Sequence, residues 1–310
     1  MKTLVTGGAG FIGSNLVDAV LARGDEVTVL DNLSTGRRVN LDGALASGAE
    51  LAEVDICDAV AVGEVFAAAR PELVFHLAAQ IDVRRSVTEP AFDAAVNVGG
   101  TANVLEAARA SGVGRVIFIS TGGALYGEGA DKQLPLPEST PIAPLSGYGQ
   151  SKWSAEGYLG LYERLHGLSG MSLRLGNVYG PRQDPLGEAG VVAIFCGLLK
   201  NGGVPTVYGD GTQTRDYIYV GDVVTAALTA GAATLGGSVN IGTGREASVL
   251  DLVEILAGLA GRDDFVPEFA PPRAGEVQRI SLDASLAERE LDWAPTTTLE
   301  QGLELTLDAV

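Results

Sequence analysis

The chain has 310 residues, 46% of them hydrophobic, and a net charge of −18. This charge argues against nucleic acids and anionic membranes as partners. No apolar run approaches the roughly 20 residues of a membrane-spanning helix, and the N-terminus lacks the long apolar core of a signal peptide, so we expect a soluble cytoplasmic protein. Cys57 and Cys196 lie far apart in the chain, without nearby residues at metal-ligand spacing, and we expect reduced thiols and no metal site.

Strands alternate with helices along the first half of the chain. Helices are predicted notably over 11–23 and 97–112, and strands over 2–6, 26–31, 49–55, 72–79 and 114–120. Such alternation indicates right-handed crossovers and a parallel sheet covered on both faces. The prediction is a Rossmann-type doubly wound α/β fold.

The pattern changes after Gly170. One more strand is predicted over 172–180, followed by segments rich in Pro and Gly and by helices over 191–200 and 248–261. We therefore expect a smaller C-terminal α/β domain for substrate, built from 180–215 plus 246–310. The dinucleotide-binding domain would comprise 1–179 plus 216–245.

Three regularly spaced glycines follow the first strand and open the first helix. Gly7, Gly10 and Gly13 have the spacing G-x-x-G-x-x-G. Glycines at this place allow a tight turn and close backbone approach, and the N–H groups of the helix start suit a pyrophosphate. We interpret this segment as a dinucleotide-binding turn.

Asp31 ends the second strand. A carboxylate there accepts hydrogen bonds from the adenine ribose hydroxyls and repels a 2′-phosphate, which favours NAD over NADP. Arg37 and Arg38, just downstream, are the alternative, since they could bind such a phosphate.

Tyr148 and Lys152 are four residues apart at the start of a helical segment. This spacing places both side chains on one helix face. A free tyrosine is a poor base at neutral pH, and a nearby ammonium stabilises the phenolate. The pair is therefore predicted to act in acid–base catalysis.

Several motifs together resemble the extended short-chain dehydrogenase/reductase family and, within it, the UDP-sugar 4-epimerases. They are "TGGAGFIG", "DNLSTG", "VDICD", "HLAAQ", "NVGGTANVLEAAR", "YGQSK", "LRLGNVYGPRQ", "TRDYIYVGDV" and "PRAGE". The resemblance implies an NAD-dependent enzyme that interconverts UDP-glucose and UDP-galactose. The Tyr148 phenolate would take the sugar 4-hydroxyl proton, hydride would pass from C4 to NAD, and the 4-keto sugar would turn over before the hydride returns.

The same resemblance assigns binding residues. Those for the cofactor are Gly7, Gly10, Phe11, Ile12, Gly13, Asp31, Asn32, Ser34, Thr35, Gly36, Asp55, Ile56, Leu77, Ala78, Ala79, Gln80, Asn97, Tyr148 and Lys152. Those for the UDP-sugar are Thr121, Tyr148, Asn177, Gly190, Val191, Val192, Val207, Tyr208, Arg215, Arg273, Glu276 and Ile280. A helix cap is the plainer interpretation of Asn97, a salt bridge with Asp210 or Asp216 that of Arg215, and a core position that of Ile280.

Two hydroxyls end the fifth strand, before Gly122 and Gly123. Family members usually carry Ser or Thr at the place of Gly122, so the proton relay would fall to Thr121 or Ser120. Because side chains alternate along a strand, we favour Thr121, with Ser120 satisfying local backbone groups.

Alternative functions share this fold. They are an epimerase of UDP-N-acetylhexosamines or UDP-glucuronate, a nucleotide-sugar dehydratase, a UDP-glucuronate decarboxylase and a non-catalytic NAD-binding protein. A dehydratase would need an Asp-Glu pair where Gly122 and Gly123 stand, and a non-catalytic protein would not need both Tyr148 and Lys152. The resemblance also implies a homodimer that pairs the helices at about 97–111 and 149–166.

Overall fold

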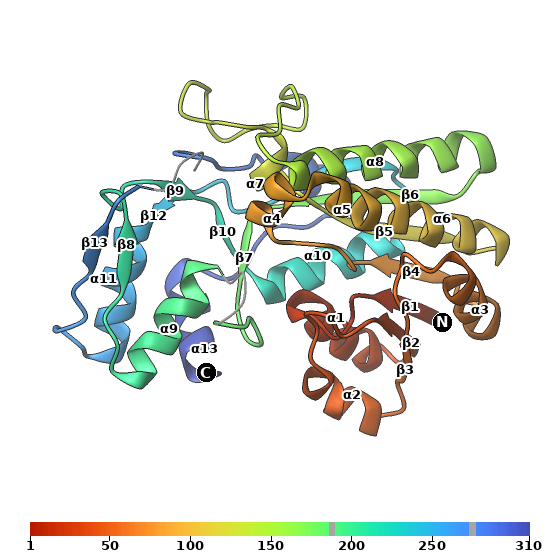
Figure 1. The fold of residues 1–310 in the computed structure, drawn as a ribbon, viewed down its shortest axis with the longest axis horizontal. Helices are drawn as coiled ribbons and strands as arrows, with labels where there is room; N and C mark the ends of the chain where they lie inside the picture. Colours follow the sequence, from red (N-terminus) through yellow and green to blue (C-terminus); the bar gives the residue numbers. More distant parts are fainter. Residues whose placement is uncertain (186–189, 273–276) are drawn as a thin grey trace.

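The computed structural model describes residues 1–185, 190–272 and 277–310. Its largest element is a parallel sheet of seven strands in the order β3-β2-β1-β4-β5-β6-β11 (Figure 1). The strands are β1 (Lys2–Thr6), β2 (Glu26–Asp31), β3 (Glu50–Glu53), β4 (Leu73–His76), β5 (Arg115–Thr121), β6 (Ser169–Leu175) and β11 (Gly237–Ile241). The predicted Rossmann-type fold is confirmed.

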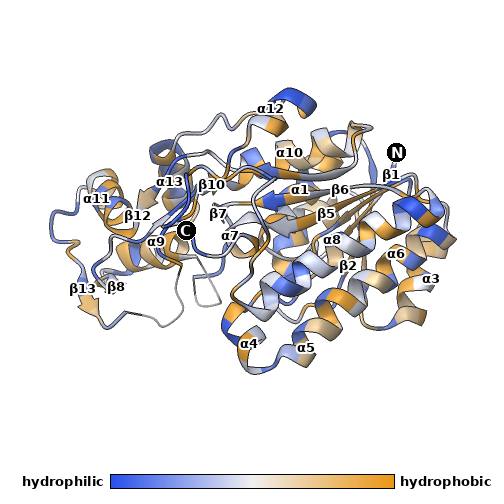
Figure 2. Cartoon of the chain, turned by 90° about the horizontal axis from the view of Figure 1, so that it is seen from above, coloured by the Kyte–Doolittle hydropathy of each residue, from blue (hydrophilic) through white to orange (hydrophobic). Residues whose placement is uncertain are grey.

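Helices cover both faces of this sheet (Figure 1). One apolar cluster joins the sheet to α1 (Phe11–Ala22), α10 (Val220–Ala232) and α12 (Ser285–Leu291). The other joins it to α3 (Ala59–Ala69), α6 (Thr101–Ala110) and α8 (Gly147–His166). Helices α6 and α8 carry both hydrophobic and hydrophilic turns, as expected for helices with one covered face (Figure 2).

A smaller region lies beside the carboxyl ends of the strands (Figure 1). Helices α9 (Val191–Asn201), α11 (Val249–Ala260) and α13 (Leu299–Asp308) share its apolar core. Its short strands form three pairs: β7 (Asn177–Tyr179) with β10 (Tyr217–Tyr219), β8 (Thr206–Tyr208) with β13 (Glu268–Ala270), and β9 (Thr214–Arg215) with β12 (Ala247–Ser248). The shorter elements are η1 (Arg38–Leu41), α2 (Asp42–Ala46), α4 (Val83–Thr88), α5 (Pro90–Ala94), η2 (Ala95–Gly100) and α7 (Gly122–Leu125).

The single strand predicted over 172–180 is wrong, because the chain bends at Gly176. The Gly176 N–H donates to Ile241 and the Asn177 N–H to Asp216, so the backbone leaves the main sheet there. A Cβ atom on Gly176 would lie 2.8 Å from the Asp216 carbonyl oxygen. Two strands, β6 and β7, result, and β7 carries Asn177 toward the smaller region.

The strand predicted over 72–79 is too long, since β4 ends at His76. The Leu77 N–H donates to both the carbonyl and the hydroxyl of Thr6, the last residue of β1, and the Ala78 N–H donates to the hydroxyl alone, so the backbone pairing of the two strands ends here. The helix predicted from residue 97 begins earlier, because α5, η2 and α6 follow one another without a break from Pro90 to Ala110.

Among the helices in the described ranges, none has the length and apolar character needed to cross a membrane.

Candidate functional site

The glycine turn joins β1 to α1 and has room for no side chain at two places. A Cβ atom on Gly7 would lie 2.6 Å from the Ala78 nitrogen. A Cβ atom on Gly13 would lie 2.1 Å from the Gly7 carbonyl oxygen. Gly7 also has a φ of +68°, in the left-handed region that favours glycine. Gly10 precedes α1 without a side-chain cap, so the N–H groups of the first helical turn stay available to an anion.

Asp31 lies beside this turn at the carboxyl end of β2. Its carboxylate accepts hydrogen bonds from the Ala9 N–H at 2.9 Å and the Leu33 N–H at 2.8 Å. Burial raises the pKa of Asp31, and these two hydrogen bonds oppose the rise. The carboxylate is thus fixed next to the glycine turn, whereas Arg37 and Arg38 are exposed.

The residues predicted for the adenine side are gathered by side-chain hydrogen bonds. The Asn32 amide donates to Asp55 at 2.8 Å and accepts from the Ser34 N–H and hydroxyl. Asp55 also accepts from the Cys57 N–H, which holds the pKa of its carboxyl below the ordinary value. Ile56 is buried, Thr35 is exposed, and Gly36 abuts the Asp31 carboxylate.

Asn97 is not a helix cap, because it lies inside η2. Its side chain accepts from the Gln80 N–H at 2.8 Å and donates to the Gln80 carbonyl at 2.9 Å. It also donates to Asp93 at 3.0 Å. The amide therefore fixes the segment after β4, residues 77–80, that was predicted to line the cofactor.

Asp93 is a buried acid that the sequence interpretation missed. One carboxylate oxygen accepts from Gln80 and Asn97, and the other is buried without a hydrogen-bond partner among the described residues. Its spacing of four residues from Asn97 was the available signal, since it places both side chains on one helix face.

Tyr148 and Lys152 lie in the first two turns of α8, which begins at the Ser146 cap. The Lys152 ammonium is 5.9 Å from the Tyr148 ring centroid and donates to the Ile119 carbonyl of β5 at 2.8 Å. Burial lowers the pKa of Lys152 to about 8, and the Asp93 and Glu156 carboxylates oppose this.

Burial raises the pKa of the Tyr148 phenol, and the Asp93 charge adds to the rise. The lowering of the Tyr148 pKa that we expected from Lys152 is therefore not the dominant effect. Tyr148 is a phenol that needs further positive charge nearby before it can serve as a base.

The two strand-end hydroxyls have different partners. Ser120 is buried and donates to Glu156 at 2.6 Å, so the expected bond to local backbone groups is wrong. Thr121 is less buried, and its hydroxyl accepts from the Ala124 N–H at 3.2 Å as the N-cap of α7.

The two glycines after Thr121 also differ. A Cβ atom on Gly122 would lie 2.4 Å from Leu282. On Gly123 it would have ordinary contacts, 3.4 Å from the Asn177 amide oxygen and 3.9 Å from the Thr121 hydroxyl. Gly123 thus brings Thr121 and Asn177, two predicted site residues, to one place.

Two predicted substrate residues of the smaller region bury their side chains. Val192 and Val207 are 1% and 0% exposed and belong to its apolar core. Tyr208 is 37% exposed and lines a hollow of about 400 Å³ with Asp210, Gln213 and Pro272. A ligand beside Val192 or Val207 would meet main-chain atoms, whereas Tyr208 offers a ring.

The remaining predicted positions lie around these elements. Gly190 caps α9 and Val191 begins it. Arg215, in β9, donates to the Thr214 carbonyl at 2.8 Å, while the Asp216 carboxylate accepts from Thr243, Gly244 and Leu282. Ile280 is 1% exposed and packs with Tyr126, Leu136 and Leu282. Arg273 and Glu276 lie outside the described residues.

Comparison with known proteins gives consistent matches. Residues 3–242 match the model of the NAD dependent epimerase/dehydratase family. The UDP-glucose 4-epimerase of Mycolicibacterium smegmatis is 47% identical over 99% of this chain and 98% of that protein.

Two solved structures are similar over the whole chain. The UDP-glucose 4-epimerase of Thermotoga maritima, solved with UDP-glucose, has a TM-score of 0.96 at 46% identity, with 100% of this chain and 98% of that one covered. The Thermus thermophilus UDP-glucose 4-epimerase, in complex with NAD, has a TM-score of 0.92 at 44% identity and the same coverage.

Proposed function

The chain belongs to the NAD dependent epimerase/dehydratase family, and we propose that it is a UDP-glucose 4-epimerase, which interconverts UDP-glucose and UDP-galactose. The observation that carries the proposal is the joint placement of Tyr148, Lys152 and the strand-end hydroxyls at the carboxyl edge of a sheet that opens with a glycine turn. Ligands bind at this edge in doubly wound sheets.

The residues of this chain fit NAD. Gly7 and Gly13 form a cradle that a Cβ atom would fill, and Asp31 presents a fixed carboxylate beside it. The cofactor residues named from the sequence would hold it, with Lys152 on the nicotinamide ribose and Asp31 on the adenine ribose. When bound, NAD supplies the oxidation and re-reduction of the sugar at C4.

Tyr148 holds and moves the proton. Its phenolate accepts the proton of the sugar 4-hydroxyl and returns it at the end of the reaction, with Thr121 as relay. The charge of Lys152, together with the positive nicotinamide ring when NAD is bound, would stabilise the phenolate. The nucleotide and diphosphate would be held by residues of both domains that the sequence predicts. These residues are Asn177, Gly190 to Val192, Val207, Tyr208, Arg215, Arg273 and Glu276.

A dehydratase is disfavoured by the residues that follow Thr121. The Asp-Glu pair that a dehydratase would need is absent, because Gly122 and Gly123 stand in its place, and the Leu282 side chain packs against Gly122. Other UDP-sugars remain as alternative substrates, which Ile280 is proposed to discriminate.

We also propose a homodimer through α8 and α6. Trp153, Tyr158, Leu161 and Leu165 are exposed on α8, and apolar side chains at helical spacing on one surface fit a helix-pairing interface. Light scattering on the wild type and on Leu161→Asp tests this. We expect a dimer for the wild type and a monomer for the variant. A variant that has the mass of a dimer would contradict the interface.

The activity is tested with purified protein and five substrates: UDP-glucose, UDP-galactose, their N-acetyl analogues and UDP-glucuronate, with products resolved by NMR. Interconversion of the first two is the expected result. If only UDP-glucuronate or only the N-acetyl sugars were turned over, the proposed substrate would be wrong. A parallel titration with NAD and NADP tests Asp31, and tighter NADP binding would contradict its role.

A further inference from the structure

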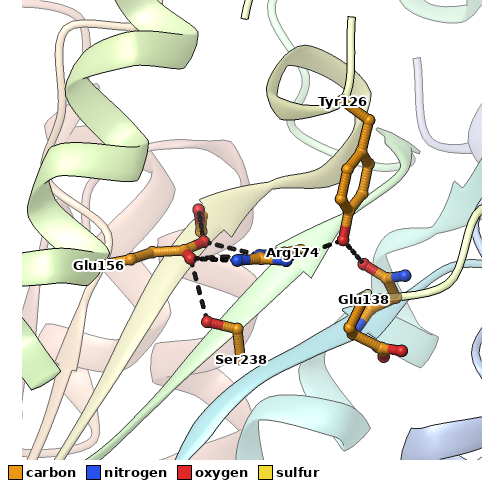
Figure 3. Close-up of polar contacts among 7 residues, drawn as sticks. Tyr126, Glu138, Glu156, Arg174 and Ser238 are labelled. Atoms are coloured by element: carbon orange, nitrogen blue, oxygen red, sulfur yellow. Dashed lines mark hydrogen bonds and ion pairs between the residues drawn. The ribbon is translucent and has the colours of Figure 1, made fainter. Parts of the chain in front are cut away.

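A buried ionic network joins α8 to three strands of the main sheet (Figure 3). At its centre Arg174 of β6 pairs with Glu156 of α8 at 2.7 Å, and their side chains are only 9% and 6% exposed. The Arg174 Nε also donates to Glu156 at 3.0 Å, so the guanidinium fork meets the carboxylate with two nitrogens.

Two serines complete the shell of Glu156. Ser120 donates to it from β5 at 2.6 Å, and Ser238 donates from β11 at 3.0 Å. A carboxylate with hydrogen bonds from three adjacent strands has its acceptor positions largely filled. Glu156 is therefore held in one place relative to the sheet.

A second branch reaches the segment after α7. The other Arg174 terminal nitrogen donates to the Tyr126 hydroxyl at 2.9 Å, and Tyr126 donates to Asn240 at 2.7 Å. Tyr126 is fully buried and directly follows the α7 turn that Thr121 caps. The Glu138 carboxylate in turn accepts from the backbone N–H of Asn240 at 2.8 Å.

The register of the strands places these groups in one row. Ser120, Arg174 and Asn240 are paired across β5, β6 and β11. In a parallel sheet such paired residues point to the same face, and here that face is the one covered by α8. The row lies one residue before Thr121, at the same edge as the proposed active site.

Helix α8 links this network to the reacting groups. Lys152 stands four residues before Glu156 and Tyr148 eight, so the three side chains follow one another along one face of a stiff helix. Any shift of Glu156 along the sheet would move Tyr148 by a similar amount.

We propose that Glu156 and Arg174 are positioning residues. They hold α8 and the turn from α7 to Tyr126 in fixed positions on the sheet, and so fix the Tyr148 phenol relative to the Thr121 hydroxyl. The inference rests on the proposed function. It extends the site to two residues that touch neither NAD nor the reacting atoms in the proposed mechanism.

The test must separate positioning from stability. Removing one partner of a buried ion pair leaves an unpaired charge and destabilises the fold, whereas removing both avoids that charge. The informative variant is therefore Glu156→Leu with Arg174→Met. The matched control is Arg115→Met, because Arg115 is equally buried, at 7%, and donates to three groups at the opposite end of β5.

Each protein is measured for kcat, KM, NAD content and Tm. We expect kcat of the double variant to fall about 10- to 100-fold with KM and NAD content little changed, as for a small misplacement of catalytic groups. Arg115→Met should keep its kcat even where its Tm falls. Unchanged kcat in the double variant, or an equal loss of kcat in the control, would overturn the proposal.

Hydrogen exchange supplies a readout that does not need turnover. The double variant should exchange faster in α7 and the amino-terminal half of α8, and Arg115→Met should not. Absence of epimerase activity in the wild type would contradict the proposed function, while unchanged exchange in these two segments would contradict the positioning role.

Discussion

The carboxyl edge of the main sheet and the smaller region present their predicted site residues in opposite ways. At the sheet edge, Asp31, Asn97 and Lys152 are polar side chains held by hydrogen bonds to the backbone. In the smaller region, Val192 and Val207 turn their side chains into an apolar core. The sheet edge therefore holds polar groups in fixed positions, whereas the packed side chains of the smaller region fix the course of the backbone around them.

This difference separates two kinds of mutational effect. Changes at the sheet edge should act on turnover and cofactor binding with the fold preserved. Substitutions of packed residues in and beside the smaller region should change substrate choice and stability together. The reason is that any added atom must displace atoms already packed there.

The largest effect is expected for Tyr148→Phe. The ring stays while the proton acceptor is removed, and such groups typically contribute about 10²–10⁴-fold to turnover. The measurement is kcat with UDP-galactose, together with NAD content. Tyr162→Phe is the matched control on the same helix, because its hydroxyl bonds only the exposed Glu106 among the described contacts. Near wild-type kcat in Tyr148→Phe would refute the assignment.

Gly13→Ala should abolish stable NAD binding. The new Cβ atom would lie 2.1 Å from the Gly7 carbonyl oxygen, so the turn must open. Cofactor content after gel filtration measures the loss. Gly63→Ala, in α3, has open space at its Cβ position and should retain the cofactor. Equal NAD content in both variants would contradict the role of the turn.

Thr121→Val should reduce turnover more than Ser120→Ala, by about tenfold or more as expected for a proton relay. Ser120 supplies one of several hydrogen bonds to Glu156, so its loss leaves the remaining donors in place. Both variants are assayed side by side with NAD content checked. A large loss in Ser120→Ala alone would reverse the two roles.

Ile280→Tyr tests the packed side of the comparison. The residue is 1% exposed, so a larger ring must push into the cluster around it or into the proposed sugar pocket. We expect the ratio of UDP-N-acetylglucosamine to UDP-glucose turnover to fall several-fold, with a stability loss of about 1–3 kcal/mol from overpacking. A lower Tm with an unchanged ratio would make Ile280 a core residue only.

The smallest effect on turnover is expected at His76, which acts on the pH dependence of stability. His76 is fully buried between the Thr6 and Thr101 hydroxyls, and burial lowers its pKa to about 3. The unfolded chain binds the proton below about pH 6.5 while the folded protein does not. The free energy of unfolding should therefore fall as pH drops from 6.5 toward 3, by up to about 1.4 kcal/mol per pH unit from this group.

Chemical denaturation of the wild type and His76→Gln across this pH range measures the effect. The difference between the two should shrink as the pH falls. His166→Gln, at the exposed end of α8, serves as the control and should follow the wild type. Parallel curves for wild type and His76→Gln would contradict the prediction.

The sequence predicted the first half of the fold well because its signals are local. Strands β1 and β2 have the predicted bounds, and the glycine turn lies where its spacing indicated. The bend at Gly176 was missed because it depends on Asp216, a residue that is near in space but distant in the chain.

The pairing of Tyr148 and Lys152 on one helix face was also visible from their spacing, whereas the network that supports this helix was not. Glu156 continues the spacing of Tyr148 and Lys152, but nothing local shows that Ser120, Arg174 and Ser238 converge on it. Arg174, which stands between Leu173 and Leu175 in a buried strand, was the available signal, since a charge buried in a sheet needs a partner.

The place of β11 in the sheet has a consequence for synthesis on the ribosome. This strand covers the outer edge of β6, yet the chain builds the first strands of the smaller region before β11 emerges. Until then β6 presents unpaired N–H and C=O groups, which invite pairing with another nascent chain. Stalling translation while β11 is still inside the ribosome should therefore promote aggregation, and stalling after β11 has emerged should relieve it.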